Sequence, residues 1–399
     1  MFSQRTSWKL AQNRLTEELE GLRRRGAKIL DLTVSNPTRI GLNYDSGAIL
    51  NALSSPQALD YDPQPKGLRS AREPVAAYYR SDHDCNLDPE RVLLTTSTSE
   101  GYSFVFRLLC NPSEELLVPK PSYPLFEFLA DLQDVKLVPY PLIYDHGWQI
   151  DFPSLEKAMT PRTRAIVVVH PNNPTGSYVS QDERLQLNSI CSKRRMAVIA
   201  DEVFLDYGLH DKKNDNKKND EQKHRSFAEN SDVLTFTLSG LSKISALPQM
   251  KVAWIASSGP AIEVVAAMAR LEVIADTYLS MNAPLQWALP KLLEQRMNIQ
   301  GQLLGRVGAN LAELDRQLAD QKSCERLSVE GGWYAVLRVP VTQSDEELCI
   351  ELLRTESVLV HPGHFYDFPG DGYLVLSLIV PEGNFAEGIA RLLRIANGR

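Results

Sequence analysis

Between residues 91 and 258, short apolar runs alternate with stretches in which apolar residues recur at helical spacing. Such alternation is typical of a mostly parallel sheet with helices on its faces. The run 165–170, Ala-Ile-Val-Val-Val-His, is apolar at almost every position, as expected for a strand that is buried on both faces. The pattern predicts a large α/β domain with seven strands, at 91–95, 115–119, 136–142, 165–170, 197–202, 233–239 and 252–258, and with intervening helices that include 99–109, 123–133 and 181–195.

The last third of the chain has a different pattern. Residues 283 to about 320 are helical in spacing, with an expected kink at Pro290, because proline interrupts helical hydrogen bonding. A helix from Ser344, extended segments at 358–362 and 373–380, and a closing helix near 382–396 follow, and they predict a smaller α+β domain. The expected division is an N-terminal segment associated with the small domain (1–45), a large domain (46–282), and an interdomain helix with the small domain (283–399).

The composition is that of a globular protein. With 43% hydrophobic and 23% charged residues among 399, the chain is neither disordered nor a coiled coil, and no apolar run approaches the roughly 20 residues of a membrane span. The 43 basic and 50 acidic residues give a formal charge of -7, which offers no general attraction to nucleic acid or anionic lipid. We therefore expect small-molecule partners, no nucleic acid and no membrane. Segment 211–224 is charged and has no apolar residue, which predicts a solvated loop.

The cysteines and the N-terminus indicate the compartment. None of the five cysteines belongs to a Cys-x-x-Cys pair, so we expect them to be reduced and predict no metal site: Cys85, Cys110, Cys191, Cys324 and Cys349. The first fifteen residues contain no apolar core of the length that a secretory signal needs. Both observations favour a cytoplasmic protein.

Lys243 is the residue whose position carries the most chemical information. It follows directly on the apolar run 233–238 and a short segment of small and hydroxyl residues. A lysine at the end of a buried strand is partly desolvated, which lowers the pKa of its amine and makes the neutral, nucleophilic form available. A Schiff-base lysine requires this property. Lysines at strand ends are also common on solvated surfaces, so this feature alone leaves both interpretations open.

Three further polar groups also stand at predicted strand ends, where ligands bind in open α/β sheets. They are the turn His-Pro-Asn-Asn-Pro-Thr-Gly at 170–176, the pair Asp201-Glu202, and the segment Thr-Thr-Ser-Thr-Ser-Glu-Gly at 95–101. The last one opens a predicted helix, whose N-terminus is suited to an anion such as phosphate. Each group also has a purely structural explanation, namely turn formation, a salt bridge and helix capping.

Taken together and in this order, the motifs resemble those of the pyridoxal-phosphate (PLP) aminotransferases of class I/II, the fold type I or aspartate aminotransferase-like group. The resemblance begins near Asp31 and reaches the C-terminus. It is carried by Asp60-Tyr61, Gly67-Leu68-Arg69, Pro119-Lys120-Pro121-Ser122-Tyr123-Pro124, His170-Pro171-Asn172-Asn173-Pro174-Thr175-Gly176, Asp201-Glu202-Val203-Phe204, Ser242-Lys243 and His361-Pro362-Gly363. It implies that the large domain binds PLP, that an amino group moves from an amino donor to an oxo acceptor, and that the protein is a homodimer with shared active sites.

The resemblance also implies roles for individual residues. The expected catalytic residues are Lys243, Asp201 and Tyr123. Lys243 is similar to the lysine of the internal aldimine, Asp201 would keep the pyridine nitrogen protonated, and the ring of Tyr123 would stack on the pyridine. The implied cofactor contacts are Ser97, Thr98, Ser99, Tyr123, Asn173, Asp201, Phe204, Ser242, Lys243 and Lys251, together with Tyr61 of the partner subunit. The implied substrate contacts are Ser35, Asn173 and Arg39.

Several cofactor positions depart from the family pattern. Phe204 stands where tyrosine is usual, so a hydroxyl that would bond the cofactor's phenolic oxygen is missing, which should raise the pKa of the internal aldimine. Gly240 replaces a phosphate-binding hydroxyl, Ser97 replaces a common glycine, and Lys251 is a point charge where arginine would be a bidentate fork. None of these changes is expected to abolish PLP binding.

A larger departure concerns the substrate. The family motif Gly-x-x-Arg-Leu-Ser reads Gly-Tyr-Leu-Val-Leu-Ser at 372–377, so Val375 replaces the arginine that clamps the substrate α-carboxylate. A buried bidentate pair of that kind contributes about 2–4 kcal/mol. Either another cation substitutes, with Arg39 as the candidate, or the substrate is not an ordinary α-amino acid.

Other functions use the same scaffold. PLP acts as an electron sink in β-eliminations and decarboxylations as well, so a carbon–sulfur lyase or decarboxylase is the alternative to an aminotransferase. A third possibility is a regulatory or binding protein that has lost catalysis, against which the presence of Lys243, Asp201 and Asn173 argues. A strict requirement for an oxo acid would exclude the lyase.

Overall fold

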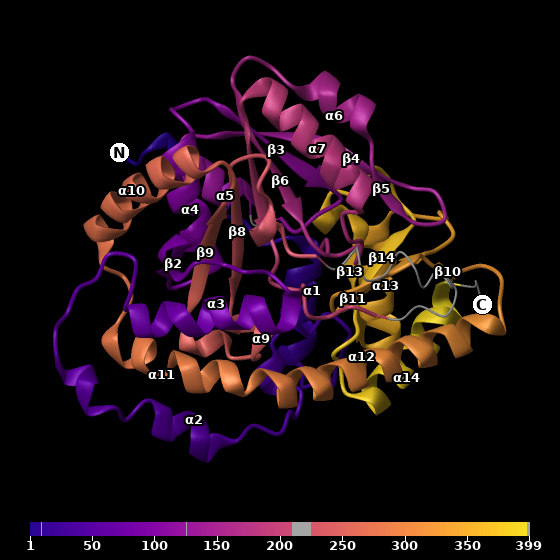
Figure 1. The fold of residues 1–399 in the computed structure, drawn as a ribbon. Helices are drawn as coiled ribbons and strands as arrows, with labels where there is room; N and C mark the ends of the chain where they lie inside the picture. The colour runs from indigo at the N-terminus through magenta and orange to yellow at the C-terminus, as the bar shows by residue number, and fades with distance from the viewer. Residues whose placement is uncertain (9, 125, 210–224, 397–399) are drawn as a thin grey trace.

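The central element of the fold is an eight-stranded sheet with the order β2-β9-β8-β7-β6-β3-β4-β5 (Figure 1). In this computed structural model, which describes residues 1–8, 10–124, 126–209 and 225–396, β9 is antiparallel to β2 and β8, β5 is antiparallel to β4, and the other pairs are parallel. The strands are β2 (Val92–Thr95), β3 (Glu115–Lys120), β4 (Lys136–Tyr144), β5 (Trp148–Ile150), β6 (Thr163–Val169), β7 (Ala197–Asp201), β8 (Thr235–Gly240) and β9 (Ala253–Ser258).

The seven predicted strands are all present, which confirms the α/β fold class, and β5 is a short addition at one edge. The expected loop at 211–224 lies outside the described residues.

Helices cover both faces of this sheet. One face packs against α4 (Thr98–Leu109), α5 (Phe126–Leu132) and α10 (Ala261–Tyr278). The other face packs against α3 (Arg69–His83), α6 (Phe152–Ala158), α7 (Gln181–Arg194) and α11 (Ala283–Glu294). Leu116 and Val118 of β3 point to the first set of helices and Leu117 to the second, so the strand is apolar without alternation because both of its faces are buried.

The predicted helical span at 283–320 is two helices, α11 and α12 (Arg296–Ala319), which meet at Gln295. Helix α11 continues through Pro290 and ends at Glu294, so the proline, where a kink is expected, lies inside a helix and the break between the two helices comes later. The helix tolerates the lost hydrogen bond because Ala288, Leu289 and other apolar side chains of α11 are buried against α3 and the sheet. Figure 1 shows α12 running from α11 towards α14 (Glu382–Ala396).

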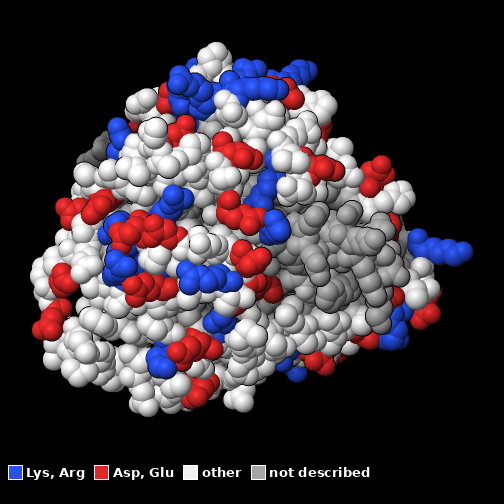
Figure 2. All heavy atoms as spheres, viewed as in Figure 1, with Lys and Arg blue, Asp and Glu red and all other residues white. Residues whose placement is uncertain are grey.

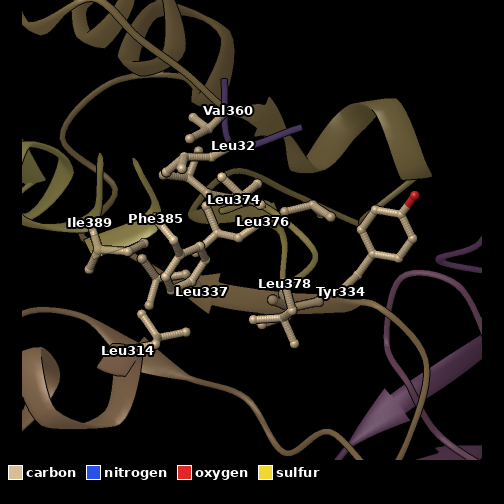
Figure 3. Packing of buried hydrophobic residues seen from close by; sticks show 14 of the residues in the cluster. Leu32, Leu314, Tyr334, Leu337, Val360, Leu374, Leu376, Leu378, Phe385 and Ile389 are labelled. Atoms are coloured by element: carbon tan, nitrogen blue, oxygen red, sulfur yellow. The ribbon is translucent and has the colours of Figure 1, made fainter. Parts of the chain in front are cut away.

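A four-stranded sheet forms the second part of the fold, in the order β10-β11-β14-β13. Its leucines Leu337, Leu374 and Leu376 pack against Leu314 of α12 and against α14 (Figure 3). The elements are β10 (Glu325–Arg326), β11 (Tyr334–Arg338), α13 (Asp345–Glu356), β13 (His361–Pro362), β14 (Tyr373–Ser377) and α14. The predicted helix from Ser344 and the closing helix at 382–396 are confirmed by α13, which Ser344 caps, and by α14.

The N-terminal segment contacts these C-terminal elements. After α1 (Arg14–Arg24), strand β1 (Leu30–Asp31) pairs in parallel with β12 (Val358–Leu359). Leu32 is fully buried and packs closely on Gly388 of α14, where a Cβ would lie 2.8 Å from a Leu32 methyl carbon. The chain then passes through α2 (Ser46–Ala52) into the large sheet.

The surface carries charges of both signs. Figure 2 shows Lys and Arg interspersed with Asp and Glu over most of the visible face. Among the helices that the structure describes, none is both long enough and apolar enough to cross a membrane.

Candidate active site

The segments that carry five of the predicted cofactor-binding residues meet at one edge of the large sheet. Strand register places the ends of β6 and β7 side by side (Val169 opposite Asp201), and it places Thr95 and Gly240 on either side of Ala253 in β9. The carboxyl ends of β2, β6, β7 and β8 and the amino end of β9 therefore meet. The segments that carry Ser97, Asn173, Asp201, Lys243 and Lys251 are attached to these five ends.

Lys243 lies in α9 (Leu241–Ile244), directly after β8. Burial lowers the pKa of its amine to about 8, and the negative charge of Asp201 opposes this shift in part. The Nζ atom faces two aromatic rings, at 4.7 Å from the ring centre of Trp333 and 5.2 Å from that of Phe204. The sequence prediction of a desolvated lysine with a lowered pKa agrees with this environment.

Asp201 ends β7, and its carboxylate is held by two donors. The Tyr102 hydroxyl donates to Oδ2 at 2.9 Å, and the backbone N–H of Val203 donates to Oδ1 at 3.1 Å. Burial raises the pKa of Asp201, while these hydrogen bonds and Lys243 favour the charged form. A buried carboxylate of this kind is stabilised by a cationic partner, such as a protonated ring nitrogen.

The turn after β6 holds two asparagines with different surroundings. The Asn172 amide donates to the carbonyl of Pro121 at 3.1 Å and to the Thr175 hydroxyl at 2.9 Å. Asn173, in contrast, has a buried Oδ1 with no hydrogen-bond partner in the described part of the chain. Buried polar atoms are normally paired, so this unpaired acceptor at the sheet edge indicates that a hydrogen-bond donor is missing.

The segment after β2 opens α4. Ser97 is the N-cap and accepts a hydrogen bond from the N–H of Glu100 at 3.2 Å, and the helix itself begins at Thr98. The backbone N–H groups of Thr98 and Ser99 are therefore among those without partners inside the helix, which makes this end suited to an anion. Glu100 accepts hydrogen bonds from the N–H of Thr96 and from the Ser280 hydroxyl, so its carboxylate is tied to neighbouring groups.

The structure explains one departure from the family pattern, Gly240, and shows the backbone of a second, Lys251. A Cβ at Gly240 would lie 2.8 Å from the Cα of Ala253 and from the Val252 carbonyl oxygen, so no hydroxyl side chain fits where β8 meets β9. Lys251 is exposed and has φ 51°, in the left-handed region, just before β9. Ser242 lies in α9, two residues after the N-cap Gly240.

An aromatic wall beside Lys243 contains residues that sequence reasoning did not assign to the site. Trp333, just before β11, is fully buried, and its ring centre lies 5.2 Å from that of Phe204 and 5.0 Å from that of Tyr207. Its Nε1 has no hydrogen-bond partner within the described residues. The Gly-Gly pair before Trp333 marks a turn in the sequence, but it gives no sign that the turn approaches Lys243.

Four predicted site residues lie further out on the surface. Tyr61 is 84% exposed and Tyr123 is 45% exposed, and Ser35 and Arg39 also have exposed side chains. Tyr123 lies close enough to Tyr334 to add, after burial, to the rise in the pKa of Tyr334. Within the described residues of the single chain, therefore, Tyr61, Ser35 and Arg39 form no hydrogen bond or ion pair with Lys243.

Val375 occupies the centre of β14, between Val336 of β11 and His361 of β13. It is 1% exposed. Residues that stand directly opposite each other across strands share a face of the sheet, so Val375 and His361 point the same way. An apolar side chain at this position offers no charge to a carboxylate.

The sequence matches the family model described as aminotransferase class I and II over residues 28–391. The chain belongs to the class I and II aminotransferases. It is therefore a PLP-dependent enzyme that transfers amino groups, as the order of the motifs and the geometry of the sheet edge indicate. The resemblance that the sequence suggested is confirmed.

Individual relatives agree with this assignment. The chain is 27% identical to a glutamate-pyruvate aminotransferase from Haemophilus influenzae, covering 94% of this chain and 92% of the relative. It is 29% identical to an alanine aminotransferase from Mycobacterium bovis, covering 92% and 85%. Among solved structures, an alanine aminotransferase from Pyrococcus furiosus shares the fold with a TM-score of 0.88 at 22% identity, over the whole of both chains.

The residues at the sheet edge fit PLP. The Nδ2 donor of Asn173 suits the phenolic oxygen, the buried Asp201 suits a protonated ring nitrogen, and the N-terminus of α4 suits the phosphate. Lys243 supplies the nucleophilic amine, which none of these other groups has.

Proposed function

We propose that Lys243 is the residue that binds PLP covalently and then moves the proton at the substrate Cα. The observation that carries this proposal is the buried amine of Lys243, whose pKa is lowered to about 8, at the sheet edge that it shares with Asp201. A partly neutral amine can act both as a nucleophile and as a base near neutral pH.

When bound, PLP supplies the electron sink for bond breaking at the substrate Cα. The residues of this chain do the rest. Asp201 holds a proton on the ring nitrogen by its negative charge, and Tyr102 and Val203 fix that carboxylate in place. Asn173 donates to the phenolic oxygen, and the aromatic wall of Phe204 and Trp333 excludes water from the Lys243 amine.

The pH dependence of cofactor attachment tests this proposal. Burial disfavours the ammonium form of Lys243, so the neutral amine prevails above a pKa of about 8. The rate at which the cofactor-free enzyme binds added PLP, followed by absorbance, should rise with pH and level off above about 8, whereas an ordinary lysine would titrate near 10.4. A midpoint near that of an ordinary lysine would contradict the assignment.

We propose an α-amino acid as the donor and a 2-oxo acid as the acceptor. The names of the relatives, alanine aminotransferase and glutamate-pyruvate aminotransferase, support this substrate class. Ser35 and Asn173 remain our proposed polar contacts to the substrate. The carboxylate must be bound differently from the usual family pattern, since Val375 provides no cation, and Arg39 is the proposed replacement.

Three variants test how the carboxylate is bound. Val375→Arg should lower KM for alanine and glutamate by about tenfold or more, because it restores a bidentate partner. Arg39→Ala should raise KM if Arg39 has taken over, and Arg39→Lys, which keeps the charge, should raise it less. The measurement is the half-reaction of the PLP enzyme with each amino acid. Efficient wild-type reaction with glutamate that survives Arg39→Ala would refute the Arg39 assignment and the idea of a missing clamp.

We propose a homodimer in which Tyr61 reaches the phosphate bound by the partner subunit. Leu59 and Tyr61 are 91% and 84% exposed, although both are large and apolar or aromatic. They line a groove of about 540 Å³ together with Leu94, Leu279 and Trp287. Sedimentation of the purified enzyme should give twice the chain mass of 44.7 kDa, and Tyr61→Ala should weaken PLP binding. A fully active monomer would contradict the proposal.

We also propose the domain division at 1–45, 46–282 and 283–399, and a cytoplasmic location. The pairing of β1 with β12 and the shared core of Leu15, Leu30 and Leu32 with the C-terminal elements support joining the N-terminal segment to the small domain. The five cysteines, all of them within the described residues, form no disulfide with one another, which supports a reducing compartment.

A further inference from the structure

Three backbone carbonyls beside Lys243 are each bonded by a side chain from a different part of the chain. The Tyr207 hydroxyl donates to the Lys243 carbonyl at 2.6 Å. Nε2 of Gln300 donates to the Ile244 carbonyl at 3.0 Å, and the Tyr44 hydroxyl donates to the Ala246 carbonyl at 2.8 Å. The Lys243 and Ile244 carbonyls end α9, where helices leave carbonyl oxygens without helical partners, and the Ala246 carbonyl follows two residues later. The Lys243 carbonyl also accepts the N–H of Ala246 at 3.1 Å.

The segment needs such support. Helix α9 has only four residues, and its N-cap is Gly240, which makes no side-chain capping bond. A single helical turn is not stable by itself, because nucleation fixes several residues for one hydrogen bond. The direction in which the Lys243 side chain leaves the backbone therefore depends on bonds from outside α9.

Gln300 differs from the two tyrosines because its amide is itself held in place. Nε2 also donates to Oδ2 of Asp206 at 3.1 Å. Asp206 accepts the Tyr78 hydroxyl at 3.0 Å, and Nε2 of His83 lies 3.0 Å from Oδ1. The side chains of His83 and Asp206 are 8% and 7% exposed, and Gln300 is also buried. The amide of Gln300 is thus fixed by a buried network that is anchored on α3.

We propose that Gln300 is a positioning residue for Lys243, acting through its bond to the Ile244 carbonyl. This inference rests on the proposed role of Lys243. Gln300 belongs to α12. Further along this helix, Asn310 donates to the carbonyls of Leu378 and Val380, which follow β14, at 2.8 and 2.7 Å. The same helix therefore bonds the lysine segment near its N-terminus, through Gln300, and the residues after β14 near its middle, through Asn310.

The experiment uses the full-length PLP enzyme and two matched variants of α12. Gln300→Met keeps the size of the side chain and removes the donor to Ile244. Asn310→Leu likewise removes a buried amide that bonds two backbone groups, but it does not touch α9. The readouts are the pH titration of the bound cofactor's absorbance, the melting temperature, and kcat and KM for the amino donor.

Gln300→Met should shift the absorbance midpoint by about half a pH unit or more. It should also lower kcat by about tenfold and change KM by less than about twofold, because a misplaced group slows the reaction more than it weakens binding. Asn310→Leu should lower the melting temperature but keep the wild-type midpoint. An unshifted midpoint in Gln300→Met, or the same shift in both variants, would overturn the proposal.

If Gln300→Met does not fold, a second variant without the donor carries the same test. Because glutamate would add a buried charge beside Asp206, the neutral variant Gln300→Leu is used: it lacks the donor, adds no charge, and must also shift the midpoint. If Lys243 does not bind PLP, the cofactor is found on another lysine of the wild-type enzyme, so this failure is distinguished from a failure of the Gln300 proposal.

Discussion

Replacing Lys243 by alanine is expected to reduce the half-reaction with an amino donor by at least about 10³-fold, because both the nucleophile and the proton carrier are lost. PLP should still bind without a covalent link, since Asp201, Asn173 and the N-terminus of α4 are unchanged. The measurement is single-turnover absorbance after mixing with the donor.

A lysine outside the site provides the control. Lys291 on α11 is exposed and pairs with Glu294 at 2.9 Å, so Lys291→Ala should behave like the wild type. If Lys243→Ala kept a rate within tenfold of the wild type, another group would have to carry the chemistry.

Asp201→Ala is expected to have the second-largest effect. Without the carboxylate, nothing holds a proton on the cofactor ring nitrogen. Loss of such electrostatic stabilisation raises the activation free energy by about 3–4 kcal/mol, which lowers kcat by about 10²–10³-fold. PLP affinity should fall by less, because the other contacts remain. Near-normal turnover in Asp201→Ala would show that Asp201 is not the partner of the ring.

The neighbouring carboxylate separates this effect from general damage to the strand end. Glu202 is also buried, and burial raises its pKa to about 7, but it faces the Ser226 hydroxyl and the N–H of Phe227. Glu202→Gln should therefore lower stability without a comparable loss of turnover.

The sequence predicted the positions of Lys243, Asp201 and Asn173 because each follows an apolar strand within a few residues. Parallel strands bring their carboxyl ends to one edge, so a local pattern is sufficient to group these residues. The strand order was not needed for this inference. The same logic explains why the N-terminus of α4 was predicted as part of the site.

Trp333 and Gln300 could not be predicted in this way. Their contacts with Lys243 and Ile244 join residues that are far apart in the chain, and they depend on how β11 and α12 pack against the large sheet. No local pattern marks a buried tryptophan or glutamine as a neighbour of a lysine in another element.

Helix boundaries show a similar limit. The predicted helix at 123–133 begins at Phe126, because Pro124 disfavours a helical conformation at Tyr123. Strands β1 and β12 have two residues each, which is too short for any periodicity, and they are defined by their pairing with each other.

Reduction of the PLP enzyme with borohydride, followed by proteolysis and mass spectrometry of the labelled peptide, tests the central claim most directly. The reagent fixes the cofactor to the lysine that holds it, independently of any substrate. We expect the label on Lys243, in the peptide that joins β8 to β9. A label on Lys251 or any other lysine, or no label in an enzyme that contains PLP, would contradict it.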